Sequence, residues 1–188
     1  TLILVVLALA IISPDFRTLD NFMKLLRQAS VNGLIAFGMT AVILTGGIDL
    51  SVGSALAVSS LVCAMLMKAG VNPVLSMLAA LALGTGLGCV SGTLVTKGRL
   101  QPFIATLITM TVYRGLTLIL SGGKPVSNLI AADDAGASAA VFNGFGKGML
   151  WEIPVPAIIF LVCFGAFLFI LSRTVTGRRI YATGSNEK

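Results

Sequence analysis

Six apolar stretches follow one another along the chain, separated by short polar or glycine-rich segments. They cover residues 1–13, 29–45, 51–67, 73–96, 102–120 and 153–171. An α-helix needs about 20 apolar residues to cross the roughly 30 Å of hydrocarbon in a bilayer. The first stretch is too short to span it, whereas the others are of that order. The pattern therefore predicts an all-α polytopic transmembrane helical bundle with about six hydrophobic segments.

Segment 14–28 mixes apolar and charged residues at helical spacing. Thr18 and Asp20 are residue types that cap helix N-termini well. An amphipathic helix of this kind lies in the membrane interface with its apolar face in the lipid. We therefore predict a short interfacial helix over 14–28. Its apolar face carries Phe16, Leu19, Phe22, Met23, Leu25 and Leu26, and its charges are Asp15, Arg17, Asp20, Lys24 and Arg27.

Segment 46–50, with the sequence GGIDL, separates the second and third apolar stretches. An aspartate at bilayer depth costs about 2.5–3.5 kcal/mol, and each glycine weakens a helix by about 1 kcal/mol. The segment is therefore either a sharp turn at the membrane surface or a broken helix inside the membrane, as in many transporters. Asp49 itself has two interpretations. It caps the helix that begins near Leu50, or it contacts a substrate or forms part of a gate.

Small residues recur at every fourth position of the fourth stretch. Ala80, Gly84, Gly88 and Gly92 have this spacing, which lets a neighbouring helix approach closely. A dinucleotide-binding loop is excluded because no strand precedes the glycines and their spacing does not fit. We predict that Gly84, Gly88 and Gly92 are helix-packing residues.

Composition and charge support a membrane protein and give it an orientation. The chain is 56% hydrophobic and 11% charged, against about 25% charged in soluble domains. Its net charge of +6 comes from residues that punctuate the apolar stretches, so a nucleic-acid partner is not expected. Basic loops face the cytoplasm. This rule places Lys97, Arg99 and the region 172–188 in the cytoplasm and loop 121–152 outside.

The residues offer no site for covalent chemistry. Histidine is absent, which removes Ser-His-Asp chemistry and most zinc sites. Cys63, Cys89 and Cys163 lie inside apolar stretches without metal-ligand spacing. Neither Lys124 nor Lys147 belongs to a phosphate-binding loop. We therefore expect no cofactor, no metal and no enzymatic activity, and an energy-driven role would need an ATPase on another chain.

Three segments of the chain resemble motifs of one family, the ribose-type permeases of bacterial sugar ABC importers. They are TGGIDLSVGS at 45–54, FIATL at 103–107 with YRGL at 113–116, and GRRIYATGSNE at 177–187. They occur in the family's order and at similar separations, and the resemblance covers nearly the whole chain. Two departures are Ser185, where the family often has glycine, and the end at Lys188, where family members continue. We expect a single permease domain over 1–188, truncated at both ends.

The resemblance implies a transmembrane subunit of the bacterial inner membrane that imports a monosaccharide by alternating access. Its partners would be a cytoplasmic ATPase subunit, a periplasmic sugar-binding protein, membrane lipid and a second permease subunit, identical or different. Loop 121–152 would be periplasmic and 172–188 a cytoplasmic coupling region. The sugar is not identified, and ribose is the first candidate. A secondary transporter and an intramembrane enzyme are the alternatives.

Candidate site residues lie in or between these motifs, and each has a structural alternative. Arg114 either pairs with carboxylates or carbonyls inside the bundle or lines the sugar path. Thr106 and Thr109 either bond back to their own helix or face a pore. Gly184, Ser185, Asn186 and Glu187 either dock on the ATPase or form an ordinary polar loop. Our candidates for the substrate pathway or gate are Asp49, Ser51, Phe103, Thr106, Thr109, Tyr113 and Arg114.

Overall fold

The chain is helical throughout most of its length. The computed structural model describes residues 1–126 and 137–185. Their elements are α1 (Leu2–Ile12), η1 (Pro14–Arg17), α2 (Leu19–Leu44), α3 (Val52–Lys68), α4 (Pro73–Thr96), α5 (Pro102–Ser121), α6 (Ala137–Lys147), β1 (Met149–Leu150), β2 (Ile153–Pro154), α7 (Val155–Arg173) and α8 (Val175–Ser185).

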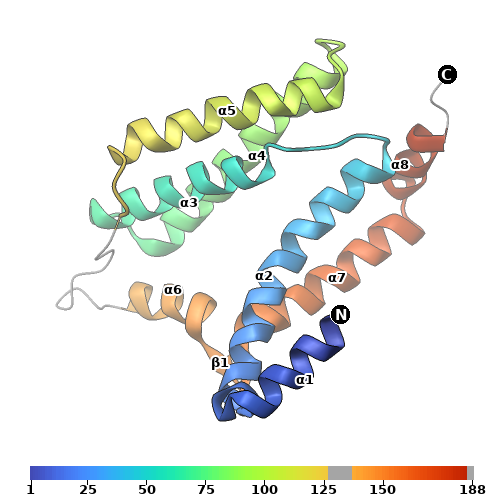
Figure 1. The fold of residues 1–188 in the computed structure, drawn as a ribbon. Coiled ribbons are helices and arrows are strands. Elements are labelled where there is room, and N and C mark those ends of the chain that lie inside the picture. Colours follow the sequence, from blue (N-terminus) through green and yellow to red (C-terminus); the bar gives the residue numbers. More distant parts are fainter. Residues whose placement is uncertain (127–136, 186–188) are drawn as a thin grey trace.

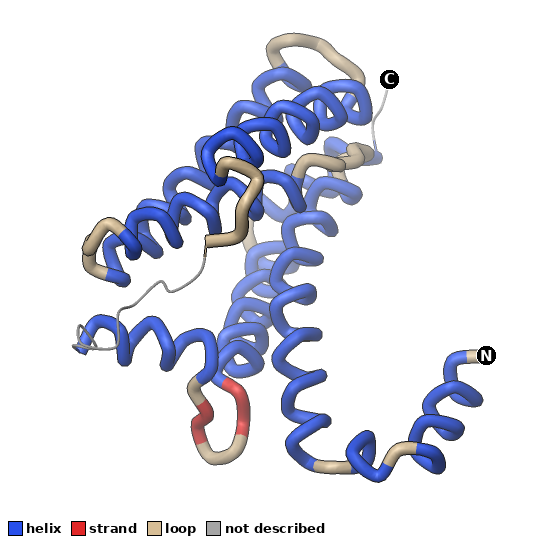
Figure 2. Tube along the Cα trace, turned by 60° about the vertical axis from the view of Figure 1, so that its left-hand side comes forward, coloured by secondary structure: helices blue, strands red, loops and turns tan. Residues whose placement is uncertain are grey.

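The long helices form two groups. Helices α3, α4 and α5 pack against one another, and α2 pairs with α7 (Figure 1). The α2–α3 connection joins the two groups, and α8 lies beside the end of α2. Helix α1 projects from the opposite end of α2, after η1 (Figure 2). The connection between α2 and α3 is therefore where the two groups can influence each other.

Three helices have the length and composition of membrane spans. They are α4, α5 and α7, with 24, 20 and 19 residues, whereas α1 and the 17-residue α3 are shorter apolar helices. Helix α2 has 26 residues, but its first turns carry charges. The predicted all-α membrane bundle is confirmed, and the count of six segments is not.

Small hydroxyl residues form much of the interior, and large apolar residues face outward. Ser51, Ser76, Ser91 and Thr109 are buried, whereas Ile119 on α5 is 77% exposed. In a soluble protein the large aliphatic side chains would be inside. Membrane helices instead associate through small residues and hydroxyl groups, because lipid already solvates their apolar surface. This distribution is the one expected of helices in a bilayer.

Aromatic rings and a glycine hold α2 against α7. The ring of Phe37 stacks on Phe160 at 5.2 Å and on Phe167 at 5.3 Å between centroids. Phe160 also lies directly on the backbone of Gly33, where an added Cβ would overlap the ring. The α2–α7 pair therefore depends on the missing side chain at position 33.

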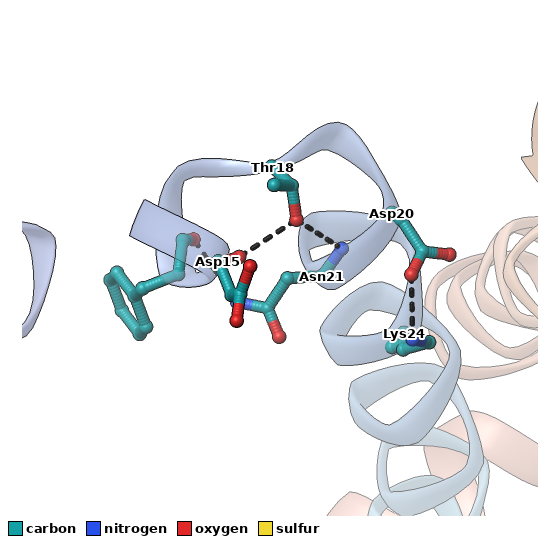
Figure 3. Close-up of polar contacts among 6 residues, drawn as sticks. Asp15, Thr18, Asp20, Asn21 and Lys24 are labelled. Atoms are coloured by element: carbon teal, nitrogen blue, oxygen red, sulfur yellow. Dashed lines mark hydrogen bonds and ion pairs between the residues drawn. The ribbon is translucent and has the colours of Figure 1, made fainter. Parts of the chain in front are cut away.

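Segment 14–28 differs from the separate interfacial helix that its pattern predicts. Thr18 caps α2 by accepting a hydrogen bond from the backbone amide of Asn21 at 3.3 Å, which confirms one of the two predicted caps (Figure 3). The helix then continues to Leu44, because no proline or glycine interrupts its first turns. Two of its charges are used locally. Lys24 pairs with Asp20 at 2.6 Å, and Arg27 donates to the backbone carbonyl of Lys147 at 3.2 Å.

Two segments expected to be loops contain secondary structure. Segment 121–152 includes α6 and β1, and β1 pairs antiparallel with β2. Trp151 and Glu152 form the tight turn of this hairpin with positive φ angles of 50° and 68°. The region 172–188 contains α8, which begins after Thr174 donates to Ile170 O and accepts from the amide of Gly177. Short helices at membrane-span ends have little apolar content and so leave a weak sequence signal.

Candidate functional site

The α2–α3 corner, which we define as residues 45–51, begins with a glycine-dependent helix end. The amide of Gly46 donates to Ile43 O at 2.9 Å, and the amide of Gly47 donates to Val42 O at 3.0 Å. Gly46 has a φ of 79°, a conformation that favours glycine at a helix C-terminus. These contacts satisfy the last carbonyls of α2 and turn the chain toward α3. Segment 46–50 is therefore a turn between two separate helices.

Asp49 fixes the other side of the corner. Its Oδ1 accepts hydrogen bonds from the backbone amide of Ser51 at 2.7 Å and from the hydroxyl of Ser51 at 2.6 Å. Ser51 is the residue before α3, which begins at Val52. This geometry supports the structural interpretation of Asp49, with the helix starting two residues after Leu50. A role of Asp49 in substrate contact or gating stays a prediction.

Ser51 connects the corner to a buried hydroxyl network, which we define as Ser51, Ser91, Thr109 and Tyr113. Ser91 on α4 lies at the centre, and its Oγ is 3.3 Å from Ser51 Oγ, 3.1 Å from Thr109 Oγ1 and 3.4 Å from the Tyr113 hydroxyl. The four side chains are at most 4% exposed. The network therefore joins the corner to α4 and α5 in the interior.

Proton counting shows how the network is satisfied, because each hydroxyl has one proton to donate. Ser51 donates to Asp49, Tyr113 donates to the backbone carbonyl of Leu87 at 2.8 Å, and Thr109 donates to carbonyls of its own helix at 3.2 Å. Only the Ser91 proton is left to bridge the hydroxyl oxygens. Ser91 thus serves one of three acceptors at a time.

Thr106 ties the first turns of α5 to the corner. Its Oγ1 lies 2.8 Å from Pro102 O and 3.2 Å from Ile48 O in the corner. Thr109 likewise bonds to Ala105 O one turn earlier. Both threonines therefore bond back to their own helix, and both are buried rather than facing an open path.

Helix α5 presents the candidate residues on two different faces. Thr106, Thr109 and Tyr113 point into the packed interior, whereas Phe103 is 48% exposed and Arg114 is also exposed. Within the part of the chain that the structure describes, Arg114 has no hydrogen bond or ion pair. The intrabundle partner expected for Arg114 is thus not found among these residues. The seven pathway candidates do not form one surface.

The glycines of α4 and the residues of α8 are also separated. Gly84 faces α3, and an added Cβ would lie 3.1 Å from Ser59 Oγ, whereas Gly88 and Gly92 have no described atom within 4 Å of that position. Packing at Gly88 and Gly92 stays a prediction. Gly184 and Ser185 belong to the last turn of α8. Asn186 and Glu187 lie outside the described residues.

Ser91 is the central residue that sequence reasoning missed. Its signal is weak, because a single serine in a glycine-rich apolar stretch is ordinary. Its position seven residues after Gly84, on the face that meets α3, is the only pointer, since residues seven apart share a helix face. Among the described residues, no group of three His, Cys, Asp or Glu side chains is placed to hold a metal ion.

The corner, the inward-facing hydroxyls and the apolar exterior describe a multi-pass membrane protein of the transport type. Residues 21–188 match the family described as branched-chain amino acid transport system / permease component, and the chain belongs to this family. The resemblance to ribose-type permeases is therefore confirmed at the level of the family.

Particular relatives are sugar permeases. The chain is 48% identical over 187 residues to the ribose import permease protein RbsC of Bacillus subtilis, covering 100% of the chain and 56% of that relative. It is 42% identical to RbsC of Escherichia coli, covering 99% and 56%, and 40% identical to the D-allose transport system permease protein AlsC of Escherichia coli, covering 94% and 52%. The chain thus spans about half the length of these relatives. No solved structure gives a significant match.

Proposed function

We propose that the chain forms part of the transmembrane subunit of an ATP-driven importer for ribose or a related monosaccharide. The observation that carries this proposal is the 48% identity to a ribose import permease along the whole chain. A cytoplasmic ATPase, a periplasmic sugar-binding protein and a second permease subunit would complete the importer in the bacterial inner membrane. The family description names amino acid transport, so the sugar rests on the relatives.

The charges at the two ends of the helices support the orientation. The α2–α3 corner lies near the start of α5, since a Cβ on Gly47 would be 3.8 Å from Pro102 Cβ. The loop before Pro102 carries Lys97 and Arg99, and α8 at the same end carries further arginines (Figure 1). Basic residues next to span ends favour the cytoplasmic side. In this orientation the corner faces the cytoplasm, and segment 14–28, loop 121–152 and the hairpin lie outside.

The exposed face of α5 is our candidate for the sugar path. Arg114 is a charged side chain within a span, and such residues usually face a bundle interior or a water-filled cavity. Its five N–H donors suit the hydroxyl oxygens of a sugar, and the exposed ring of Phe103 lies on the same helix. Thr106, Thr109 and Tyr113 would act indirectly, by holding α5 on the corner.

Transport by the full-length protein tests this proposal. The permease, its ATPase and its binding protein would be reconstituted in liposomes, and uptake of radiolabelled ribose measured with and without ATP. We expect ATP-dependent uptake that Arg114→Leu reduces about tenfold or more, with Arg114→Lys in between. Uptake that follows an ion gradient and ignores ATP would favour a secondary transporter instead. Full activity of Arg114→Leu would remove Arg114 from the path.

A further inference from the structure

Two glycines place α8 directly on the backbone of other helices. A Cβ added to Gly177 would overlap the carbonyl oxygen of Leu171 in α7. A Cβ added to Gly184 would overlap the carbonyl oxygen of Leu44, the last residue of α2, and would lie 3.5 Å from the Cα of Thr45. Side chains at exposed positions usually give way when they are crowded, whereas these neighbours are backbone atoms and cannot rotate aside.

Both contacts lie on one face of the same helix. Gly177 and Gly184 are seven residues apart, which is about two helical turns. Arg178 and Arg179 fall on other faces and are exposed. Helix α8 therefore rests between the end of α7 and the end of α2, with its charged surface free (Figure 1).

The contact at Gly184 is adjacent to the α2–α3 corner. Leu44 and Thr45 are followed at once by Gly46 and Gly47, which have no side chains to absorb a displacement. The corner then continues to Asp49 and through Ser51 into the hydroxyl network. A shift of α8 toward α2 would thus reach the network through a short series of packed backbone contacts.

We infer that Gly184 is a positioning residue, through which the position of α8 sets the conformation of the α2–α3 corner. This inference deepens the proposed function, because it names an internal route by which movement at the cytoplasmic end would reach the membrane helices. Here Gly184 acts inside the chain, whereas its sequence motif suggested a contact with the ATPase.

The first test measures the corner without measuring transport. The full-length protein, with Cys63, Cys89 and Cys163 replaced by alanine, would carry Ile48→Cys, since Ile48 is 51% exposed in the corner. We expect Gly184→Ala to change the rate of maleimide labelling at position 48 about fivefold or more, the lower end for coupled sites. The matched control is Gly165→Ala on α7, where a Cβ meets no described atom within 4 Å, and it should leave the rate unchanged.

The second test runs in the opposite direction, because coupling between two sites is reciprocal. Ser91→Ala in the network should alter labelling of a cysteine introduced at the exposed Ser185 on α8, even if Gly184→Ala does not fold. Equal labelling rates in this pair, or in a folded Gly184→Ala protein, would overturn the inference. Altered labelling in a protein that shows no ATP-dependent ribose uptake would leave the inference standing and reject the proposed function alone.

Discussion

The proton count in the hydroxyl network predicts that Ser51 matters more than Ser91 for stability. Ser51 donates to the carboxylate of Asp49 at 2.6 Å, and a hydrogen bond to a charged group contributes about 1.5–3 kcal/mol. Ser91 donates to one neutral hydroxyl at a time. Hydrogen bonds between membrane helices contribute about 0.6 kcal/mol on average and about 1.7 kcal/mol at most. We therefore expect Ser51→Ala to cost at least about twice as much as Ser91→Ala.

The assay is unfolding of the full-length protein in mixed micelles, followed by far-UV circular dichroism. Ser60→Ala is the matched control, because Ser60 lies exposed on α3 and bonds only to Ala57 O of its own helix. Its free energy of unfolding should stay within about 0.5 kcal/mol of the wild type, as for most surface substitutions. The double variant Ser51→Ala with Ser91→Ala should be additive within about 0.5 kcal/mol, because the Ser51 proton is directed to Asp49.

One result would refute this reasoning directly. If Ser91→Ala were as destabilising as Ser51→Ala, the proton of Ser51 could not be committed to Asp49. A large coupling energy between positions 51 and 91 would lead to the same conclusion. In that case the bond between Ser51 and Ser91, at 3.3 Å, would be the main link between the corner and α4.

Three further predictions address the corner, the α2–α7 contact and the orientation. Asp49→Ala should lower ribose uptake at unchanged membrane abundance, because the corner loses both acceptor contacts, and normal uptake would exclude Asp49 from function. Gly33→Val should destabilise the protein by about 1–3 kcal/mol through overpacking, whereas Gly38→Ala, with open space around its Cβ position, should not. Cysteines replacing Lys97 and Lys124 should label from opposite sides of the membrane, and labelling from one side would reject the orientation.

Local features of the fold were predictable from the sequence. The helices from Val52 to Ser121 follow directly from apolar stretches bounded by turn residues, and Thr18 caps α2 as its residue type suggests. The turn at 46–50 follows from adjacent glycines and an aspartate. The first turns of α2 were assigned to a separate helix because their charges resemble an interface. Those charges are compatible with a long helix that extends beyond the apolar region.

The arrangement of the candidate site was less predictable, because it depends on the register between helices. Ser51 meets Ser91, forty residues away, and no periodicity within either segment indicates that pairing. The division of α5 into a buried face with Thr109 and an exposed face with Arg114 also requires knowing where α3 and α4 lie. Helix propensity and apolar content describe one segment at a time, whereas these contacts are set by packing between segments.

The bonding pattern of the interior suits a protein whose helices must move. Thr106 and Thr109 each bond to a carbonyl of their own helix, and Ser51 bonds within the corner. When α5 separates from α3 and α4, these hydroxyls keep their partners, and only the contacts of Ser91 and Tyr113 between helices are lost. Each lost bond costs about 0.6 kcal/mol on average. An interior held by donors without a local partner would resist such rearrangement, because every separated group would be left unsatisfied in the membrane.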